Sequence, residues 1–248
     1  MSKYIEKFWD ESAKDYRFKQ WEKTRVARFD YACTKDILLK FLKPNKNDRI
    51  LEIGCGSGKW SKIISTKCKK LIATDISKKM IEEAKMHCRN KNIHFIRADF
   101  MKLDIEQKFD KIYAIRSIEY IKDKTNLLDK IKLLLKENGK VVIVTKNKLC
   151  LWDMTKKVKN FWQEKISYTH LINLMKRNSF QNIIIKPVVI RLPIFVSGNR
   201  EFPLIRKNYE SLVLNFFKKI TKITQTTKII RNLLLPFSES YLIYGEKH

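Results

Sequence analysis

The stretch Arg49-Ile-Leu-Glu-Ile-Gly-Cys-Gly-Ser-Gly-Lys59 decides the fold. It begins with apolar residues around Glu52, as a buried strand does, and then places glycine at alternate positions, at Gly54, Gly56 and Gly58. Glycine has no Cβ, so the chain can turn sharply and a ligand can approach the backbone closely. The pattern predicts a strand that ends in a ligand-binding turn and continues into a helix.

Two phosphate-binding motifs come close to this stretch without matching it. The dinucleotide fingerprint G-x-G-x-x-G requires its third glycine where Lys59 stands. The P-loop G-x-x-x-x-G-K-[S/T] requires glycine in place of Ile53 and serine or threonine in place of Trp60. What remains is an acidic residue followed by G-x-G-x-G, which suits a ligand that carries a cationic head and no phosphate.

Four further apolar runs follow at the spacing of alternating strands and helices. They lie at residues 71–75, 92–99, 109–115 and 140–147. In a doubly wound sheet, the first two runs place the carboxylates of Asp75 and Asp99 at the tips of neighbouring strands. A carboxylate at the first of these tips can accept hydrogen bonds from both hydroxyls of a ribose.

The rest of the chain completes this architecture. Residues 4–42 predict two N-terminal helices, residues 169–177 another helix, and residues 180–190 and 240–245 two more strands. We therefore expect an α/β fold with a Rossmann-like, seven-stranded, doubly wound sheet. The expected units are N-terminal lid helices at 1–44, a core at 45–190, a helical cap insert between the last two strands at 191–237, and a final strand at 238–248.

The glycine-rich stretch resembles motif I of the class I S-adenosylmethionine (SAM) methyltransferases, and the strand-terminal acids extend the resemblance over roughly residues 45–190. The resemblance implies SAM as cofactor, S-adenosyl-L-homocysteine (SAH) as its product and no metal. It implies that Glu52 orients the methionine moiety, that Asp75 binds the ribose and that Asp99 accepts from the adenine amino group. The other implied cofactor-binding residues are Tyr16, Arg25, Gly54, Cys55, Gly56, Gly58, Ile76, Phe100 and Arg116.

The loop after the fourth expected strand holds the candidate catalytic residues. Many members of the resembled family carry a Glu-His pair there, whereas this chain has Glu119-Tyr120. A general base is needed only if the acceptor must lose a proton. Glu119, Tyr120 or the more distant His170 could then supply it. If no base is needed, catalysis consists of positioning the acceptor and excluding water.

Composition excludes several other classes of protein. Five cysteines without a C-x-x-C pair and four scattered histidines indicate neither a disulfide framework nor a zinc site. No apolar run reads as a signal peptide or is long enough to cross a bilayer. We expect a cytoplasmic protein, with peripheral contact to the inner membrane face as an option. The formal net charge of +27 is spread along a lysine-rich chain, so nucleic acid is the less favoured partner.

The expected insert has a basic amphipathic half at residues 204–235. Apolar residues recur there at helical spacing, and Lys218, Lys219 and Lys222 add positive charge. Two interpretations stay open. The segment is either a cap helix whose lysines are solvated, or an element that contacts an anionic membrane or a lipid-like acceptor.

The expected function is methyl transfer from SAM to an oxygen or nitrogen of a small-molecule acceptor, with lipid- or glycan-linked acceptors included. No Asn/Asp-Pro-Pro-Tyr/Phe segment follows the fourth strand, which argues against methylation of base amino groups. No cysteine follows the fourth or fifth strand in a Pro-Cys or Thr-Cys setting, which argues against carbon-5 methylation of cytosine. Two alternatives remain: an RNA methyltransferase that uses the basic surface, and a non-catalytic SAM-binding subunit that docks a partner.

Overall fold

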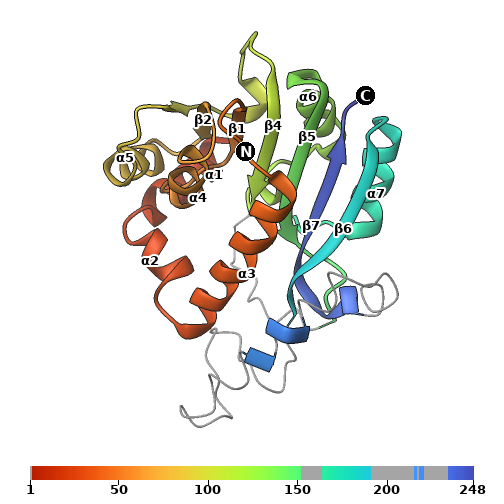
Figure 1. Ribbon diagram of the computed structural model, residues 1–248. Coiled ribbons are helices and arrows are strands. Elements are labelled where there is room, and N and C mark those ends of the chain that lie inside the picture. Colours follow the sequence, from red (N-terminus) through yellow and green to blue (C-terminus); the bar gives the residue numbers. More distant parts are fainter. Residues whose placement is uncertain (1, 152–163, 191–214, 217, 221–233) are drawn as a thin grey trace.

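A single seven-stranded sheet with helices on both faces forms the body of the molecule (Figure 1). The computed structural model describes residues 2–151, 164–190, 215–216, 218–220 and 234–248. The strands are β1 (Arg49–Ile53), β2 (Lys70–Asp75), β3 (Ile93–Arg97), β4 (Phe109–Ile115), β5 (Leu135–Lys146), β6 (Gln181–Ile190) and β7 (Ser238–Glu246). The helices are α1 (Ser2–Ser12), α2 (Tyr16–Trp21), α3 (Arg25–Leu42), α4 (Lys59–Ser65), α5 (Lys78–His87), α6 (Lys124–Leu134) and α7 (Tyr168–Arg177), with short turns η1 (Phe100–Lys102), η2 (Ile118–Tyr120) and η5 (Leu235–Phe237).

The strand order is β3-β2-β1-β4-β5-β7-β6. Strands β1 to β5 pair in parallel, and β7 runs antiparallel between β5 and β6. The order reverses between β1 and β4, because β2 and β3 continue on one side and β5 on the other. A ligand of an open α/β sheet binds beside such a reversal, at the carboxyl ends of the strands. The predicted Rossmann-like, seven-stranded, doubly wound sheet is confirmed.

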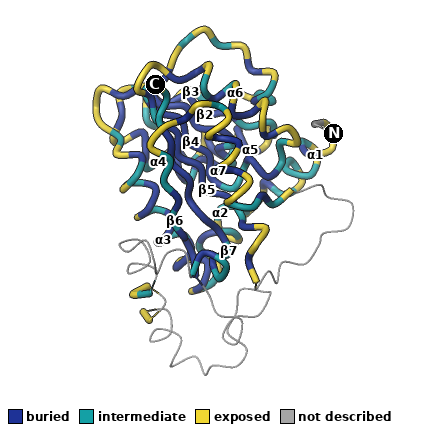
Figure 2. The backbone as a smooth tube through the Cα atoms, turned by 90° about the vertical axis from the view of Figure 1, so that its right-hand side faces the viewer, coloured by how far each residue is buried: buried dark blue, intermediate teal, exposed yellow. Residues whose placement is uncertain are grey.

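Both faces of the sheet are buried, which fixes the strand tips in place. Side chains from α6 and α7, including Leu128, Ile131 and Leu171, pack with Ile112 on one face. Side chains from α3 and α4, including Ile37, pack on the other. The central strands are accordingly dark in Figure 2, where colour marks burial. The sequences of strands that are covered on both faces are nearly continuous apolar runs, and the strands of this chain have such sequences.

Three N-terminal helices form where the sequence predicts two. Asp15 takes a left-handed conformation with a φ of 61° and precedes α2, and Thr24 caps α3 by accepting a hydrogen bond from the Ala27 N–H at 3.0 Å. Ile37 and Leu38 of α3 are fully buried under the sheet. α3 therefore belongs to the core, whereas the sequence placed it with the lid helices.

The two strands predicted to flank the insert are β6 and β7. Most of the insert itself, including the amphipathic pattern at residues 204–235 and Lys222, lies outside the described residues. In the described part, Phe216, Lys218 and Lys219 are exposed. In the portion of the chain that the structure describes, no helix is both long and apolar enough to span a membrane.

Candidate functional site

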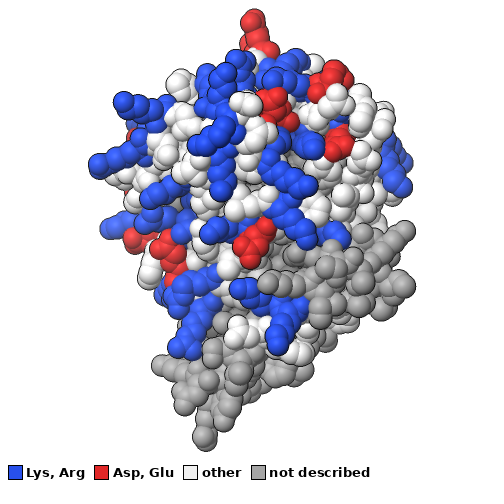
Figure 3. Space-filling model, in the orientation of Figure 1, with Lys and Arg blue, Asp and Glu red and all other residues white. Residues whose placement is uncertain are grey.

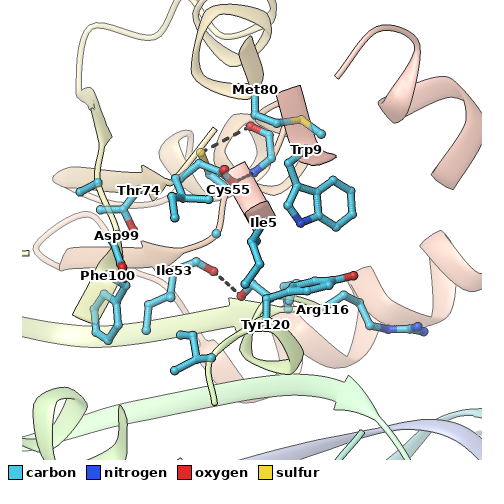
Figure 4. Close-up of a pocket in the computed structure, with 18 of the residues that line it drawn as sticks. Ile5, Trp9, Ile53, Cys55, Thr74, Met80, Asp99, Phe100, Arg116 and Tyr120 are labelled. Carbon is cyan, nitrogen blue, oxygen red and sulfur yellow. Dashed lines mark hydrogen bonds between the residues drawn. The ribbon is translucent and has the colours of Figure 1, made fainter. Parts of the chain in front are cut away.

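A cavity of about 490 Å³ lies at the carboxyl ends of β1, β2 and β4 and beside the turn that follows β3 (Figure 4). Its volume is within the range of small-molecule sites, and its walls are mostly apolar with a few polar groups. The predicted site residues that line it are Tyr16, Gly54, Cys55, Gly56, Asp75, Ile76, Asp99, Phe100, Arg116 and Tyr120. The fold thus brings together residues that are more than a hundred positions apart in the sequence.

The turn after β1 forms the floor of the cavity. Gly54 has a φ of +71°, and a Cβ there would lie 2.3 Å from the Cβ of Ser117. Gly56 has a φ of +52°, and a Cβ there would reach the Tyr16 ring at 3.5 Å. Gly54 is therefore required both by its φ and by the close approach of Ser117, whereas at Gly56 the positive φ favours glycine.

Two acids stand at the tips predicted from the sequence. Asp75 accepts from the Gly56 N–H at 2.8 Å and from the Ser77 N–H at 3.0 Å, which joins the tip of β2 to the glycine turn. Asp99 accepts from the Met101 N–H at 3.0 Å, and this cap places Phe100 against the cavity. Each carboxylate oxygen retains a second lone pair that can accept from a ligand.

Burial raises the pKa of Asp75 to about 6, against the lowering effect of the backbone N–H groups of Ser77, Gly56 and Ile76. If ionised Asp75 accepts from ribose hydroxyls, SAM should bind more tightly as the pH rises. We expect the dissociation constant for SAM to fall about tenfold between pH 5 and pH 7 and then level off. Calorimetry across this range measures it, and Asp75→Asn, which cannot ionise, should remove the dependence. An equally steep profile in Asp75→Asn would assign the titration to another group.

Glu52 does not line the cavity, so the methionine-orienting role that the resemblance implies stays a prediction. Its side chain is 1% exposed and accepts a 2.5 Å hydrogen bond from the Ser61 hydroxyl of α4. Burial raises the pKa of Glu52 to about 7. Glu52 thus ties β1 to the helix behind the glycine turn through one carboxylate oxygen, and the other oxygen is buried without a hydrogen-bond partner.

Glu52 should make the folded protein less stable at neutral pH than at acidic pH. A carboxyl with a raised pKa binds its proton more tightly in the folded state. Its contribution to the free energy of unfolding therefore falls as the pH rises from about 4.5 to about 7. Relative to wild type, Glu52→Gln should gain on the order of 3 kcal/mol in unfolding free energy between pH 4.5 and pH 8. Denaturant melts at both pH values measure it, and a pH-independent difference would contradict it.

Helix α1 closes one side of the cavity. Asp10 accepts from the Ser77 hydroxyl at 2.6 Å and from the Lys79 N–H at 3.0 Å, so α1 is docked on the start of α5. The Trp9 ring lies edge-on to Tyr16 and to Tyr120, with ring centroids 5.3 and 5.2 Å apart. This contact places Trp9 between the N-terminal helices and the loop after β4, as the labelled side chains in Figure 4 show.

Several predicted site residues lie away from the cavity. Arg25 is exposed at the start of α3 and does not line the cavity. Gly58 faces the protein interior, where a Cβ would meet the sulfur of Cys88 at 2.8 Å. His170 is exposed on α7, which packs on β6 and β7. These positions do not support direct roles in ligand binding or catalysis.

Of the three candidate catalytic residues, Tyr120 lines the cavity and the other two do not. Glu119 is fully buried, and its carboxylate accepts from the Lys146 N–H at 2.8 Å. Its side chain therefore points to the carboxyl end of β5. The loop after β4 thus presents the tyrosine, and not the glutamate, to a ligand.

Ile5, Met80 and Ser117 are among the lining residues that sequence reasoning missed. Ile5 and Met80 lie on apolar helix faces, and such faces predict packing without saying whether the neighbour is protein or ligand. Ser117 lies in the loop after β4, and its hydroxyl donates to the Ile53 carbonyl at 2.5 Å. No motif in the sequence distinguishes these residues from ordinary core positions.

The residues present fit SAM. The glycine turn, which leaves no room for a Cβ at Gly54, suits the methionine moiety, Asp75 suits the ribose, and Asp99 with Phe100 suits the adenine. Across the described residues, no group of three or more His, Cys, Asp or Glu side chains could hold a metal ion.

Comparison with known proteins agrees with this geometry. Residues 23–184 match the family described as a methyltransferase domain. A ubiquinone biosynthesis O-methyltransferase from Pelagibacter ubique is 31% identical over 150 residues, which cover 59% of this chain and 62% of that protein. A ribosomal RNA small subunit methyltransferase A from Mycoplasmopsis synoviae is 27% identical over 141 residues, which cover 54% of each chain.

The chain spans about half the length of the curated relatives it matches. Among solved structures, the N-methyltransferase NodS from Bradyrhizobium japonicum WM9 in complex with SAH shares the fold. The TM-score is 0.62 at 13% identity, and the match covers 96% of this chain and 98% of that one.

Proposed function

Because the chain belongs to the class I SAM-dependent methyltransferase family, we propose that it transfers the methyl group of SAM to an oxygen or nitrogen atom of a small-molecule acceptor. One observation supports this most: a single cavity of about 490 Å³ is lined by the glycine turn, Asp75 and Tyr120 together. A cofactor held by the turn and Asp75 would leave room for an acceptor beside Tyr120. The O-methyltransferase relative favours an oxygen acceptor.

Bound SAM supplies a methyl group that its sulfonium already activates. The residues of this chain then have three tasks. Asp75 and Asp99 hold the nucleoside, the backbone of Gly54 and Gly56 lines the methionine end, and Ile5 with Trp9 excludes water from above. Alignment and exclusion of water account for most of the catalysis in such a displacement.

Tyr120 is the group placed to handle a proton at the acceptor end. In its deprotonated form, its phenolate oxygen would accept the acceptor's proton as the methyl group is transferred and become the neutral hydroxyl, with Trp9 fixing the orientation of its ring. Glu119 would act indirectly, by anchoring the same loop to β5 through the Lys146 N–H.

The test of this proposal is methyl transfer to an unfractionated mixture. The protein is incubated with methyl-labelled SAM and a metabolite and lipid extract, and the products are partitioned between aqueous and organic phases. Labelled small-molecule product should form with wild type and fall sharply with Asp75→Ala. If no labelled small-molecule product is found in either the aqueous or the organic phase, the proposal is overturned.

A second candidate function has its own structural support. A groove of about 680 Å³ beside the glycine turn is lined by Arg17, Lys35, Lys59, Lys62 and Lys67. Basic side chains are also spread over the face of the molecule in Figure 3. These features and the ribosomal RNA methyltransferase relative would suit an RNA acceptor. RNA binding that falls steeply between 50 and 200 mM salt, with transfer of label to RNA, would favour this candidate.

Membrane contact through residues 204–235 stays a prediction. If the segment rests on an anionic bilayer, Lys218, Lys219 and Lys222 each contribute about 1 kcal/mol. Wild type should then float with anionic liposomes at low salt, and the triple change to glutamate should abolish flotation without altering SAM binding. Wild type that stays in the dense fraction would rule out this contact and favour a cap over the active site.

A further inference from the structure

Arg116 lies at the end of β4 in a conformation that is rare for any residue except glycine. Its φ is +55°, and its N–H donates to the Val144 carbonyl at 2.8 Å. Nη2 donates to the Ser240 hydroxyl of β7 at 3.0 Å, while Nε and Nη1 are buried and have no hydrogen-bond partner. Buried donors without an acceptor cost free energy, and strained backbone of this kind clusters at functional sites.

A second cation lies beside this guanidinium. Lys146 ends β5 and lies opposite Ser240 in the β5–β7 pair. Its pKa is lowered to about 8, first by burial and then by the charge of Arg116. In the described ranges, its ammonium group has no hydrogen bond and no ion pair.

The acids nearby form no direct ion pair with the two cations. Glu119 and Glu239 lie close enough to favour the charged form of Lys146, and Lys165 opposes them. One Glu119 oxygen accepts from the Lys146 backbone N–H, and the other is buried without a hydrogen-bond partner. Among the described residues, Arg116 and Lys146 therefore have no carboxylate within ion-pair distance.

The guanidinium lies at the acceptor end of the cavity. Figure 4 shows the Arg116 guanidinium and the Tyr120 hydroxyl pointing the same way, away from Asp99 and Phe100. The proposed function places the adenine at Asp99 and Phe100. Arg116 therefore lines the cavity on the side of the tyrosine proposed to receive the acceptor's proton, and Lys146 lies behind it, opposite Ser240 and outside the cavity lining.

We propose that Arg116 and Lys146 form an anion subsite that binds a carboxylate or phosphate group of the methyl acceptor. The subsite rests on the proposed function, because the acceptor must share the cavity with SAM. A planar guanidinium suits the oxygens of either group, and a charge-assisted hydrogen bond from Nε or from Nη1 would satisfy a donor that otherwise has no partner. Lys146 adds a compact charge on the same side.

The methionine carboxylate of the cofactor is the competing occupant for Arg116. SAH carries this carboxylate, whereas 5′-methylthioadenosine has the same nucleoside without the amino-acid part. If the Arg116 guanidinium bound the cofactor carboxylate, removing it would weaken SAH binding and leave methylthioadenosine binding unchanged. The affinity ratio of the two nucleosides therefore separates the two roles.

Calorimetry with SAH-saturated protein tests the subsite, with phenyl phosphate, benzoate and neutral benzyl alcohol as probes. We expect at least one anion to bind wild type at least tenfold more tightly than benzyl alcohol, and the preferred anion identifies the acceptor group. Arg116→Met and Lys146→Met should each weaken that anion at least tenfold. Lys148→Met removes the same charge from an exposed position two residues away and should change nothing.

The outcomes separate the subsite from the function on which it rests. If wild type binds SAH but no anion more tightly than benzyl alcohol, the subsite is refuted and the proposed function stands. The subsite is also refuted if anion binding survives in both variants, or if Arg116→Met weakens SAH but not methylthioadenosine. Wild type that does not bind SAH refutes the proposed function itself. Unchanged methylthioadenosine affinity shows that each variant is folded.

Discussion

Tyr120→Phe is expected to lower turnover about 10²- to 10⁴-fold and to leave SAM affinity within about twofold of wild type. The change removes one hydroxyl and keeps the ring that contacts Trp9. The packing of the loop after β4 should therefore survive, and only proton transfer should be lost. The measurement compares the turnover number with the calorimetric affinity for SAM in the same preparation.

Tyr168→Phe is the matched control, because Tyr168 packs against Tyr241 on the far face of the sheet and does not line the cavity. It should keep wild-type turnover. Full turnover in Tyr120→Phe would show that no base acts at this position. The acceptor would then be a group that is already deprotonated when it binds.

Gly54→Ala should abolish SAM binding and lower the stability of the native turn by roughly 2–5 kcal/mol. Alanine at a φ of +71° costs about 1–2 kcal/mol. Its Cβ would also overlap the Ser117 Cβ at 2.3 Å, and overpacking of this kind costs about 1–3 kcal/mol. Thermal unfolding and SAM calorimetry measure the two effects separately.

A second substitution isolates the steric part. Ser117→Gly removes the overlapping Cβ, after which the nearest atom to the new side chain is the Ser117 Cα at 3.7 Å. The double variant Gly54→Ala/Ser117→Gly should therefore recover the stability lost to the steric overlap, about 1–3 kcal/mol. It should still lose the roughly 1–2 kcal/mol that alanine costs at a positive φ. Ser117→Gly alone is the reference, because it also loses the hydrogen bond to Ile53. Wild-type stability in Gly54→Ala would contradict the described path of the turn.

The strand tips could be predicted from the sequence because their signals are local. The glycine turn after β1 and the acids Asp75 and Asp99 each follow an apolar run, and parallel pairing brings such run ends to one edge of the sheet. The sequence therefore located the cofactor end of the cavity. Its order of strands also led to the observed topology.

The orientation of single side chains could not be predicted in the same way. Glu52 lies in a strand that is buried on both faces, so alternation does not show which face meets a ligand. The structure directs it to Ser61 and away from the cavity. Glu119 and Tyr120 are adjacent, and the short turn η2 decides which one is exposed to the cavity.

Contacts between segments that are distant in the chain could not be predicted from the sequence. Asp10 reaches Ser77 across 67 positions, and this contact places Trp9 over the cavity. Arg116 reaches Ser240 across 124 positions. His170 is a polar residue on an amphipathic helix, and only the packing of α7 on the far end of the sheet shows that it is remote from the cavity.

The most direct test of SAM binding at the strand tips is calorimetric titration of wild type and Asp75→Ala with SAH and with NADH. We predict one SAH site per chain, about 1–3 kcal/mol weaker in Asp75→Ala, because ribose hydroxyls would lose their acceptor. NADH should give no binding heat, since the turn lacks the third glycine of the dinucleotide fingerprint. Equal SAH affinity in both proteins, or NADH binding as tight as that of SAH, would contradict the assignment.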